Sequence, residues 1–281
     1  MVLVRDGVIG VFDSGVGGLS VLRAIWQELP FEPVIYLADQ AHVPYGQRPI
    51  EEVRDFSLEI VRYFLNHGAK LIVVACNAAS AASLRQLRET FPDTPFVGME
   101  PAVKPAAETT RSGVVGVLAT PATFQGELYA SVVERFANDV QLLQHTCPGL
   151  VNQIENGDLD GRISHSILED ALLPMIQGGI DTVVLGCTHY PFVIPLIQAI
   201  VGNEVRVIDP APAVARQTRR LLETQHLVQK KPDDSPTTLR QPFLTRFFST
   251  GDPQRLQSLL PRLLNQAFKV EKATWLKSTL H

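Results

Sequence analysis

The chain has 281 residues, a length that fits about two domains of ~100–200 residues each. Its 25 basic and 29 acidic side chains give a net charge of −4, which argues against a nucleic-acid partner because no basic surface is available. With 45% hydrophobic and 19% charged residues, the composition excludes a disordered chain and is typical of a folded soluble protein.

The apolar stretches are too short to cross a membrane. The longest, residues 71–76 and 190–201, fall short of the ~18 uninterrupted apolar residues that a span requires. The run Val8–Phe12 is shorter than the core of a signal peptide and is closed by Asp13 rather than by a small-residue cleavage site. We therefore expect a cytoplasmic protein with no membrane partner.

Short β-branched runs alternate with longer amphipathic segments through most of the chain, which predicts buried parallel strands separated by helices and hence an α/β fold. The clearest helix covers residues 49–67 and is stopped by Gly68. Residues 225–243 lose this periodicity and are predicted to form a loop without chemistry, followed by a strand and a last helix. The predicted strands are Val8–Phe12, Val34–Leu37, Leu71–Ala75, Val114–Leu118, Thr182–Leu185, Val205–Ile208 and Thr245–Ser249.

A weak internal repeat divides the chain into two similar halves. Residues 7–14 and 113–120 share four identities in eight positions, GVIGVFDS against GVVGVLAT. Residues 72–77 and 183–188 form a second pair of similar segments, in which a buried strand ends in cysteine and a small polar residue. Chance could produce either similarity alone, but the two pairs of segments occur in the same order in both halves. We therefore predict two pseudo-symmetric domains, each a mostly parallel sheet flanked by helices.

Polar or titratable residues follow each predicted strand, at the sheet edge where ligands of open α/β sheets bind. One interpretation is that they only cap the following helices. Capping does not explain two cysteines at equivalent places, so we expect an active site in the cleft between the domains. The residues in question are Asp13, Ser14, Asp39, Cys76, Asn77, Thr120, Cys187, Thr188 and His189.

The cysteines and glycines exclude several other kinds of site. Three cysteines in so long a chain are no disulfide framework, and Cys147 is predicted to be packed and structural. Cys187 and His189 are too close in sequence for the usual zinc spacing, so no metal is expected. The glycines after Asp13 fail the dinucleotide fingerprint because its third glycine is replaced by Ser20.

Two thiols on opposite sides of a carbon acid can invert the configuration of its acidic carbon. One thiolate removes the proton from one face and the other thiol returns a proton to the opposite face, with cysteine pKa values near neutrality suited to both roles. Asp13 and His189 could assist the thiols, and Asn77, Thr188 and Ser14 could stabilise the developing charge. A pyridoxal cofactor requires a Schiff-base lysine, and no lysine adjoins these motifs, so no cofactor is expected.

Six motifs occur in order within residues 8–215. They are Asp13–Gly18, Val43–Arg48, Ala75–Ser80, Gly116–Thr120, Cys147-Pro148 with Ile154-Glu155, and Leu185–Pro191. Together they resemble the motifs of the glutamate racemase family, which belongs to the cofactor-independent aspartate/glutamate racemase superfamily. The pair DSGVGG and GCTHYP at this separation is highly specific.

The resemblance implies interconversion of L- and D-glutamate, which supplies D-glutamate for peptidoglycan. Cys76 would deprotonate D-glutamate and Cys187 L-glutamate, with Asp13, His189 and Glu155 assisting. It also implies a homodimer and two domains, residues 1–97 plus 209–281 and residues 98–208. The substrate-binding residues would be Asp13, Ser14, Tyr45, Gly46, Asn77, Ala78, Thr120, Thr188 and His189.

One position departs from the family pattern, because Ala78 stands where the family usually has threonine. One hydroxyl that would contact the substrate is therefore missing, at a cost of ~0.5–1.5 kcal/mol for a lost hydrogen bond. Aspartate or another small acid thus stays open as substrate. A different class also stays open, namely a non-catalytic, redox-sensitive anion-binding protein in which Cys76 and Cys187 form a regulatory disulfide.

Overall fold

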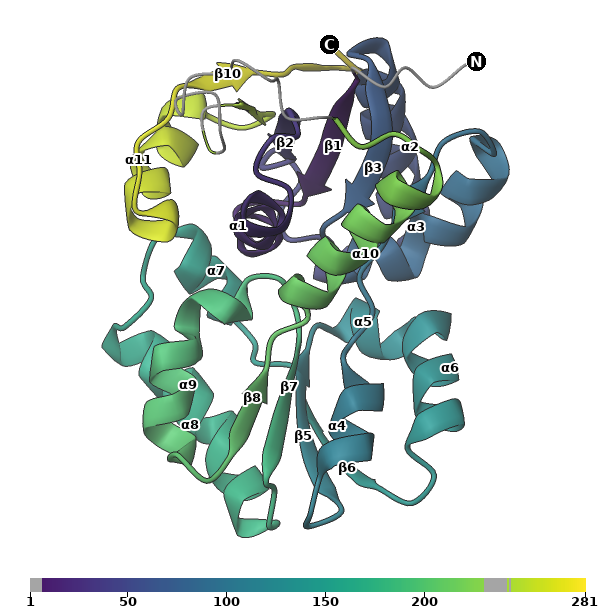
Figure 1. The fold of residues 1–281 in the computed structure, drawn as a ribbon. Helices are drawn as coiled ribbons and strands as arrows, with labels where there is room; N and C mark the ends of the chain where they lie inside the picture. Colours follow the sequence, from purple (N-terminus) through teal and green to yellow (C-terminus); the bar gives the residue numbers. More distant parts are fainter. Residues whose placement is uncertain (1–6, 230–241, 243) are drawn as a thin grey trace.

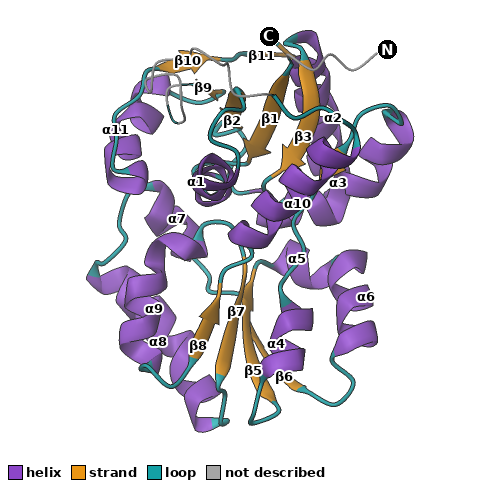
Figure 2. Ribbon diagram, in the orientation of Figure 1, coloured by secondary structure: helices purple, strands orange, loops and turns teal. Residues whose placement is uncertain are grey.

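Two parallel sheets, one in each of two lobes, form the framework of the molecule (Figures 1 and 2). The computed structural model describes residues 7–229, 242 and 244–281. The upper lobe in Figure 1 holds a six-stranded sheet of order β10-β9-β2-β1-β3-β4, and the lower lobe a four-stranded sheet of order β6-β5-β7-β8. All strand pairs within these two sheets are parallel.

The central strands are apolar on both faces because helices cover both sides of each sheet. All residues of β2 and β3 are buried, and so are those of β7. The strands of the first sheet are β1 (Val8–Asp13), β2 (Val34–Ala38), β3 (Ala69–Val74), β4 (Phe96–Val97), β9 (Thr245–Ser249) and β10 (Val270–Lys272). Those of the second are β5 (Val114–Ala119), β6 (Gln141–His145), β7 (Thr182–Gly186) and β8 (Arg206–Ile208).

The two sheets share one strand order, which confirms the predicted pseudo-symmetric α/β fold. In the first sheet β1 lies between β2 and β3, with β4 beyond β3; in the second β5 lies between β6 and β7, with β8 beyond β7. The repeated sequences correspond to β1 with β5 and to β3 with β7. All four strands of the second sheet fall within residues 98–208, while the domain boundaries at 97/98 and 208/209 stay predictions.

Helices pack around both sheets and in places return the chain from one lobe to the other. Helix α2 follows Pro49 and ends before Gly68, whose φ of +77° suits glycine. Helix α10 follows β8 of the lower lobe but packs against α1 of the upper lobe (Figure 1). The helices are α1 (Leu19–Glu28), α2 (Ile50–Asn66), α3 (Asn77–Thr90), α4 (Val103–Thr109), α5 (Pro121–Gln125), α6 (Glu127–Phe136), α7 (Leu150–Glu155), α8 (Arg162–Gln177), α9 (Ile194–Val201), α10 (Ala211–Thr224) and α11 (Pro253–Leu264), with 3₁₀ turns η1 (Tyr45–Gln47) and η2 (Tyr190–Val193).

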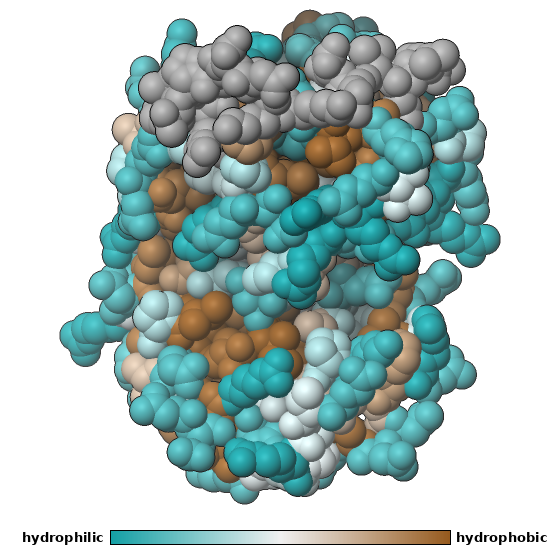
Figure 3. Space-filling model, viewed as in Figure 1, coloured by the Kyte–Doolittle hydropathy of each residue, from teal (hydrophilic) through white to brown (hydrophobic). Residues whose placement is uncertain are grey.

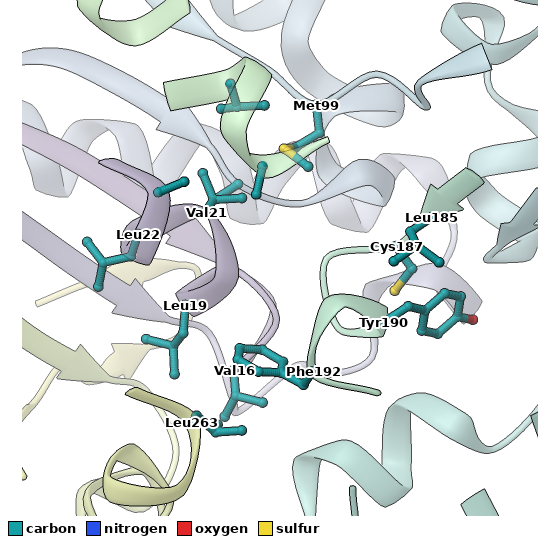
Figure 4. Close-up of a cluster of buried hydrophobic side chains, with 14 of the residues drawn as sticks. Val16, Leu19, Val21, Leu22, Met99, Leu185, Cys187, Tyr190, Phe192 and Leu263 are labelled. Atoms are coloured by element: carbon teal, nitrogen blue, oxygen red, sulfur yellow. The ribbon is translucent and has the colours of Figure 1, made fainter. Parts of the chain in front are cut away.

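One apolar cluster runs through the contact between the lobes and fixes their relative position. It joins Val16 and Leu19 of the upper lobe to Phe192 of the lower lobe, close to Cys187 (Figure 4). Burial of such side chains contributes ~1.5–3 kcal/mol each. Figure 3 shows hydrophilic side chains over the outer helices and apolar ones gathered on the lower lobe, below the hollow between the lobes.

The C-terminal region is more elaborate than the sequence predicts. After the expected last helix, α11, the chain adds β10 to the first sheet and ends in an antiparallel hairpin of β11 (Trp275–Leu276) and β12 (Thr279–Leu280). Most of the predicted loop 225–243 lies outside the described residues. Within the described part of the chain, no helix has the length and apolarity needed to span a bilayer.

Candidate active site

A cavity lies between the lobes, at the carboxyl ends of β1, β3 and β7. It brings together both predicted catalytic cysteines and most of the predicted substrate-binding residues. Of the residues predicted to be catalytic or substrate-binding, Asp13 and Glu155 do not line it, and neither does Asp39, which also follows a predicted strand. The lining residues are Ser14, Pro44, Tyr45, Gly46, Cys76, Asn77, Ala78, Thr120, Val151, Cys187, Thr188 and His189.

Cys76 forms one wall of the cavity. It follows β3 and is the N-cap of α3, where its Sγ accepts the Ala79 N–H at 3.5 Å. Burial raises the pKa of the Cys76 thiol well above 9, and the nearby charge of Asp13 raises it further. At neutral pH Cys76 is therefore a protonated thiol. The capping interpretation is correct for this residue, and its catalytic role stays a prediction.

Cys187 lies across the cavity, directly after β7, with its Sγ 3.7 Å from Nδ1 of His189. The other ring nitrogen, Nε2, lies 2.6 Å from Oε1 of Glu155. Burial by itself would lower the pKa of His189, but hydrogen bonds to Cys187 and Glu155 raise it well above 6.5. Burial would raise the pKa of Glu155, whereas the bond to His189 and its charge lower it below 4.5. His189 and Glu155 thus form a buried ion pair.

Glu155 connects the two lobes. It ends α7 in the lower lobe, yet its Oε1 accepts the N–H of Val16 at 2.7 Å and its Oε2 accepts Nε2 of Gln40 at 3.3 Å, both from the upper lobe. Gly15 permits this approach, because a Cβ added there would overlap with Oε1 of Glu155. The geometry makes Glu155 a residue that positions His189 rather than one that touches the cavity.

Asp13 lies behind the wall on the side of Cys76 and is completely buried. Its Oδ1 accepts the Gly15 N–H at 2.8 Å, and its Oδ2 accepts the Thr188 hydroxyl at 3.0 Å. Burial raises the pKa of Asp13, although the charge of His189 opposes the rise. The carboxylate thereby ties the end of β1 to the end of β7.

The amide of Asn77 is the clearest binding group of the cavity. Its Oδ1 and Nδ2 are both buried and have no hydrogen-bond partner among the described residues. An unpaired buried polar atom costs ~1–3 kcal/mol, so a ligand with both acceptor and donor atoms would stabilise this arrangement.

Two other predicted binding residues are already engaged within the protein. The Tyr45 hydroxyl donates to Oδ2 of Asp39 at 2.5 Å, and Thr120 caps α5 by accepting the Thr123 N–H at 3.4 Å. For Thr120 the capping interpretation is therefore correct, although its side chain also lines the cavity against Gly46.

A second cavity adjoins the first and shares Pro44, Gly46, Thr120 and Val151 with it. Cys147 lines this second cavity and is buried, as predicted; burial raises its pKa to about 12. In the described part of the chain, no group of three or more His, Cys, Asp or Glu side chains could hold a metal ion.

Replacing Glu155 with glutamine should lower the pKa of His189, because burial is then opposed by Cys187 with no carboxylate to help. We expect the variant's His189 ring to lose its proton at a lower pH than in the wild type, as measured by NMR titration of the ring protons. An unchanged pKa would show that Glu155 does not stabilise the positive charge of His189.

The same variant should alter stability. Loss of one partner of a buried pair costs on the order of 3–5 kcal/mol of unfolding free energy at neutral pH. Because folding lowers the Glu155 pKa below 4.5, its contribution is present above pH 4.5 and is lost as the pH falls through the folded value. Wild-type stability, measured by urea unfolding, should therefore fall more steeply below pH 4.5 than that of the variant.

Comparisons with known proteins identify the family of this chain. Residues 9–218 match the Asp/Glu/hydantoin racemase family. The glutamate racemase of Stutzerimonas stutzeri (strain A1501) is 49% identical, over 94% of this chain and 96% of that protein. The glutamate racemase of Pseudomonas aeruginosa is 46% identical, over 96% of this chain and 98% of its own length.

Solved structures give the same result. A glutamate racemase isoform from Bacillus anthracis superposes with a TM-score of 0.83 at 32% identity, covering 98% of this chain and all of that one (100%). Escherichia coli glutamate racemase, in complex with L-glutamate and an activator, gives a TM-score of 0.80 at 34% identity, over 96% of this chain and 99% of that one. The chain therefore belongs to the Asp/Glu/hydantoin racemase family.

Proposed function

We propose that this enzyme is a glutamate racemase, which interconverts L- and D-glutamate without a cofactor and supplies D-glutamate for peptidoglycan. The observation that carries the proposal is the pair of thiols, Cys76 and Cys187, which come from equivalent strand ends of the two sheets and line one cavity. The many relatives named glutamate racemase support the choice of substrate.

The reaction requires one thiolate and one thiol at its start. With D-glutamate, the Cys76 thiolate removes the α-proton, and the electron pair of the broken C–H bond is delocalised into the α-carboxylate. The Cys187 thiol then donates its proton to the opposite face of the planar carbon, which yields L-glutamate and leaves Cys187 as the thiolate. With L-glutamate the two thiols exchange roles.

The groups around each thiol are proposed to support these steps. The cationic His189, 3.7 Å from the Cys187 sulfur, stabilises negative charge as it develops there. Asp13, whose charge acts on Cys76 and whose own pKa is raised by burial, accepts the thiol proton of Cys76 when the thiolate forms. Glu155 assists by keeping His189 charged and in place.

Substrate binding is assigned to the remaining polar groups of the cavity. The unpaired amide of Asn77 binds the α-carboxylate and α-amino groups together with Thr188. Ser14, with Tyr45 and Gly46 at the start of η1, binds the side-chain carboxylate, for which the first N–H groups of a helical turn are suitable donors. Ala78 and Thr120 complete the wall.

The arrangement of the chain belongs to the same proposal. Residues 1–97 plus 209–281 form one domain and residues 98–208 the other, since β8 ends at Ile208 and α10 packs on α1. A homodimer is expected from the family resemblance, and a cytoplasmic location from the short apolar stretches of the sequence. Light scattering of the purified protein tests the dimer.

Circular dichroism measurements of L- and D-glutamate and of L- and D-aspartate, each incubated with the purified enzyme, test the substrate. We expect equimolar L- and D-glutamate from either enantiomer and at least tenfold lower kcat/KM for aspartate. Faster turnover of aspartate than of glutamate would show that glutamate is not the preferred substrate. Absence of turnover with either acid, together with a Cys76–Cys187 disulfide in thiol titrations, would instead support the redox-sensitive binding protein.

Replacing Ala78 with threonine should restore a hydroxyl to the cavity wall. A hydrogen bond contributes ~0.5–1.5 kcal/mol, so we expect the KM for glutamate to fall about twofold to tenfold with kcat little changed. The matched control is Ala82→Thr, one turn further along α3 and outside the cavity lining, which should leave KM unchanged. A KM that rises in Ala78→Thr would contradict the assignment of this wall to substrate binding.

A further inference from the structure

Asp39 is a buried carboxylate that the proposed mechanism does not use. It follows β2, is completely buried and is not among the residues that line the cavity. Its Oδ2 accepts the Tyr45 hydroxyl at 2.5 Å and lies 2.8 Å from Nδ1 of His42. Its Oδ1 accepts the Thr250 hydroxyl and the indole N–H of Trp275, each at 2.7 Å. Four groups from different parts of the chain thus converge on one carboxylate.

Trp275 approaches Asp39 from the C-terminal hairpin, more than 200 residues away in sequence (separation 236). Its ring is fixed by other aromatic rings. Trp275 meets His42 edge-on with the ring centroids 5.2 Å apart and lies 5.7 Å from Phe56, while His42 stacks on Phe56 at 3.8 Å. The indole N–H therefore points at Asp39 from a packed position, where little side-chain entropy remains to be lost.

Tyr45 connects this cluster to the substrate cavity. It begins η1, and Pro44, Tyr45 and Gly46 are consecutive residues of the cavity wall. The Tyr45 hydroxyl is held by Oδ2 of Asp39, so the position of that wall depends on where the carboxylate sits. Trp275 and Thr250 fix the other oxygen and leave Oδ2 directed at Tyr45.

We propose that Trp275 is a positioning residue for the racemase reaction: through Asp39 it holds Tyr45 and the wall residues 44–46 in the geometry that binds substrate. The inference rests on the proposed function and assigns a role in it to the C-terminal hairpin. A role of this kind affects substrate binding and leaves the two thiols untouched, so it predicts a change in KM with little change in kcat.

The test is the Trp275→Phe variant, which keeps an aromatic ring in the cluster and removes the N–H. We expect the KM for glutamate to rise about threefold to tenfold in both directions, within the range for the loss of one hydrogen bond, while kcat falls less than about twofold. The dissociation constant of D-glutamate, measured by calorimetry, should rise by the same factor. This second readout does not depend on turnover.

The chain offers a matched control in Trp26→Phe. The Trp26 indole N–H donates to the Thr245 hydroxyl at 2.8 Å, so this variant also loses one N–H···O bond to the C-terminal part of the chain. Thr245 is the first residue of β9, so it lies at the amino ends of the parallel strands, whereas the cavity lies at their carboxyl ends. We expect the control to leave KM and the D-glutamate dissociation constant within about twofold of the wild type, a difference too small for a lost hydrogen bond.

A double-mutant cycle with Tyr45→Phe completes the test. If Trp275 acts through Asp39 and Tyr45, the double variant should raise KM no more than Tyr45→Phe alone, because the link is already broken. Unchanged KM in Trp275→Phe, equal effects in Trp275→Phe and Trp26→Phe, or fully additive effects with Tyr45→Phe would each overturn the inference. Failure of the proposed function would appear in the wild type, as absence of racemisation, whereas failure of this inference appears in the variants alone.

Discussion

The carboxylate of Glu155 is the contact on which the geometry of the site depends. It comes from the lower lobe and accepts bonds from the Val16 N–H and Gln40 of the upper lobe as well as from His189. A buried carboxylate is costly unless it is paired and hydrogen-bonded, and here three donors meet that requirement. Because two of these donors come from the upper lobe, the lobes must close correctly before all three bonds to the carboxylate form. His189 comes from the same lobe as Glu155, and its bond to Glu155 holds its ring beside the Cys187 sulfur.

The symmetry of the fold explains why two thiols face each other. Cys76 follows β3 and Cys187 follows β7, the equivalent strands of two sheets with the same order. Opposing the carboxyl ends of the two sheets brings these positions to opposite walls of one cavity. The repeated structure thus places one thiol on each side of the cavity, as a reaction requires that needs an acid on one face of the substrate carbon and a base on the other. The surroundings are not symmetric, since Asp13 acts on Cys76 and His189 contacts Cys187.

The sequence predicts those parts of the molecule that depend on local pattern. The seven predicted strands and α2 agree with the structure within one or two residues, because continuous β-branched runs and one-sided apolar helices have clear periods. Strands β4 and β10, of two and three residues, were not predicted. Strand β6 was missed, since it is an edge strand with an exposed, polar pattern. The hairpin at Trp275–Leu280 was missed because its strands have two residues each, too few for any period.

Side-chain partners in the site depend on tertiary contacts that no spacing encodes. Polar strand ends located Cys76, Cys187, Asp13 and His189, and the cavity contains or adjoins all four. The bond from Val16 to Glu155 and the bonds from Thr250 and Trp275 to Asp39 join segments far apart in the sequence. The resemblance indicated Glu155, and Asp39 follows a predicted strand, but neither signal indicated these distant partners.

The central claim is that two thiols act on opposite faces of one α-carbon. Its most direct test is NMR measurement of α-proton exchange in deuterated water for L- and D-glutamate, using the wild type, Cys76→Ser and Cys187→Ser. The account predicts exchange with inversion in the wild type and a sharp loss of racemisation in each variant. Full racemisation in either variant, or inversion without incorporation of solvent deuterium, would contradict it.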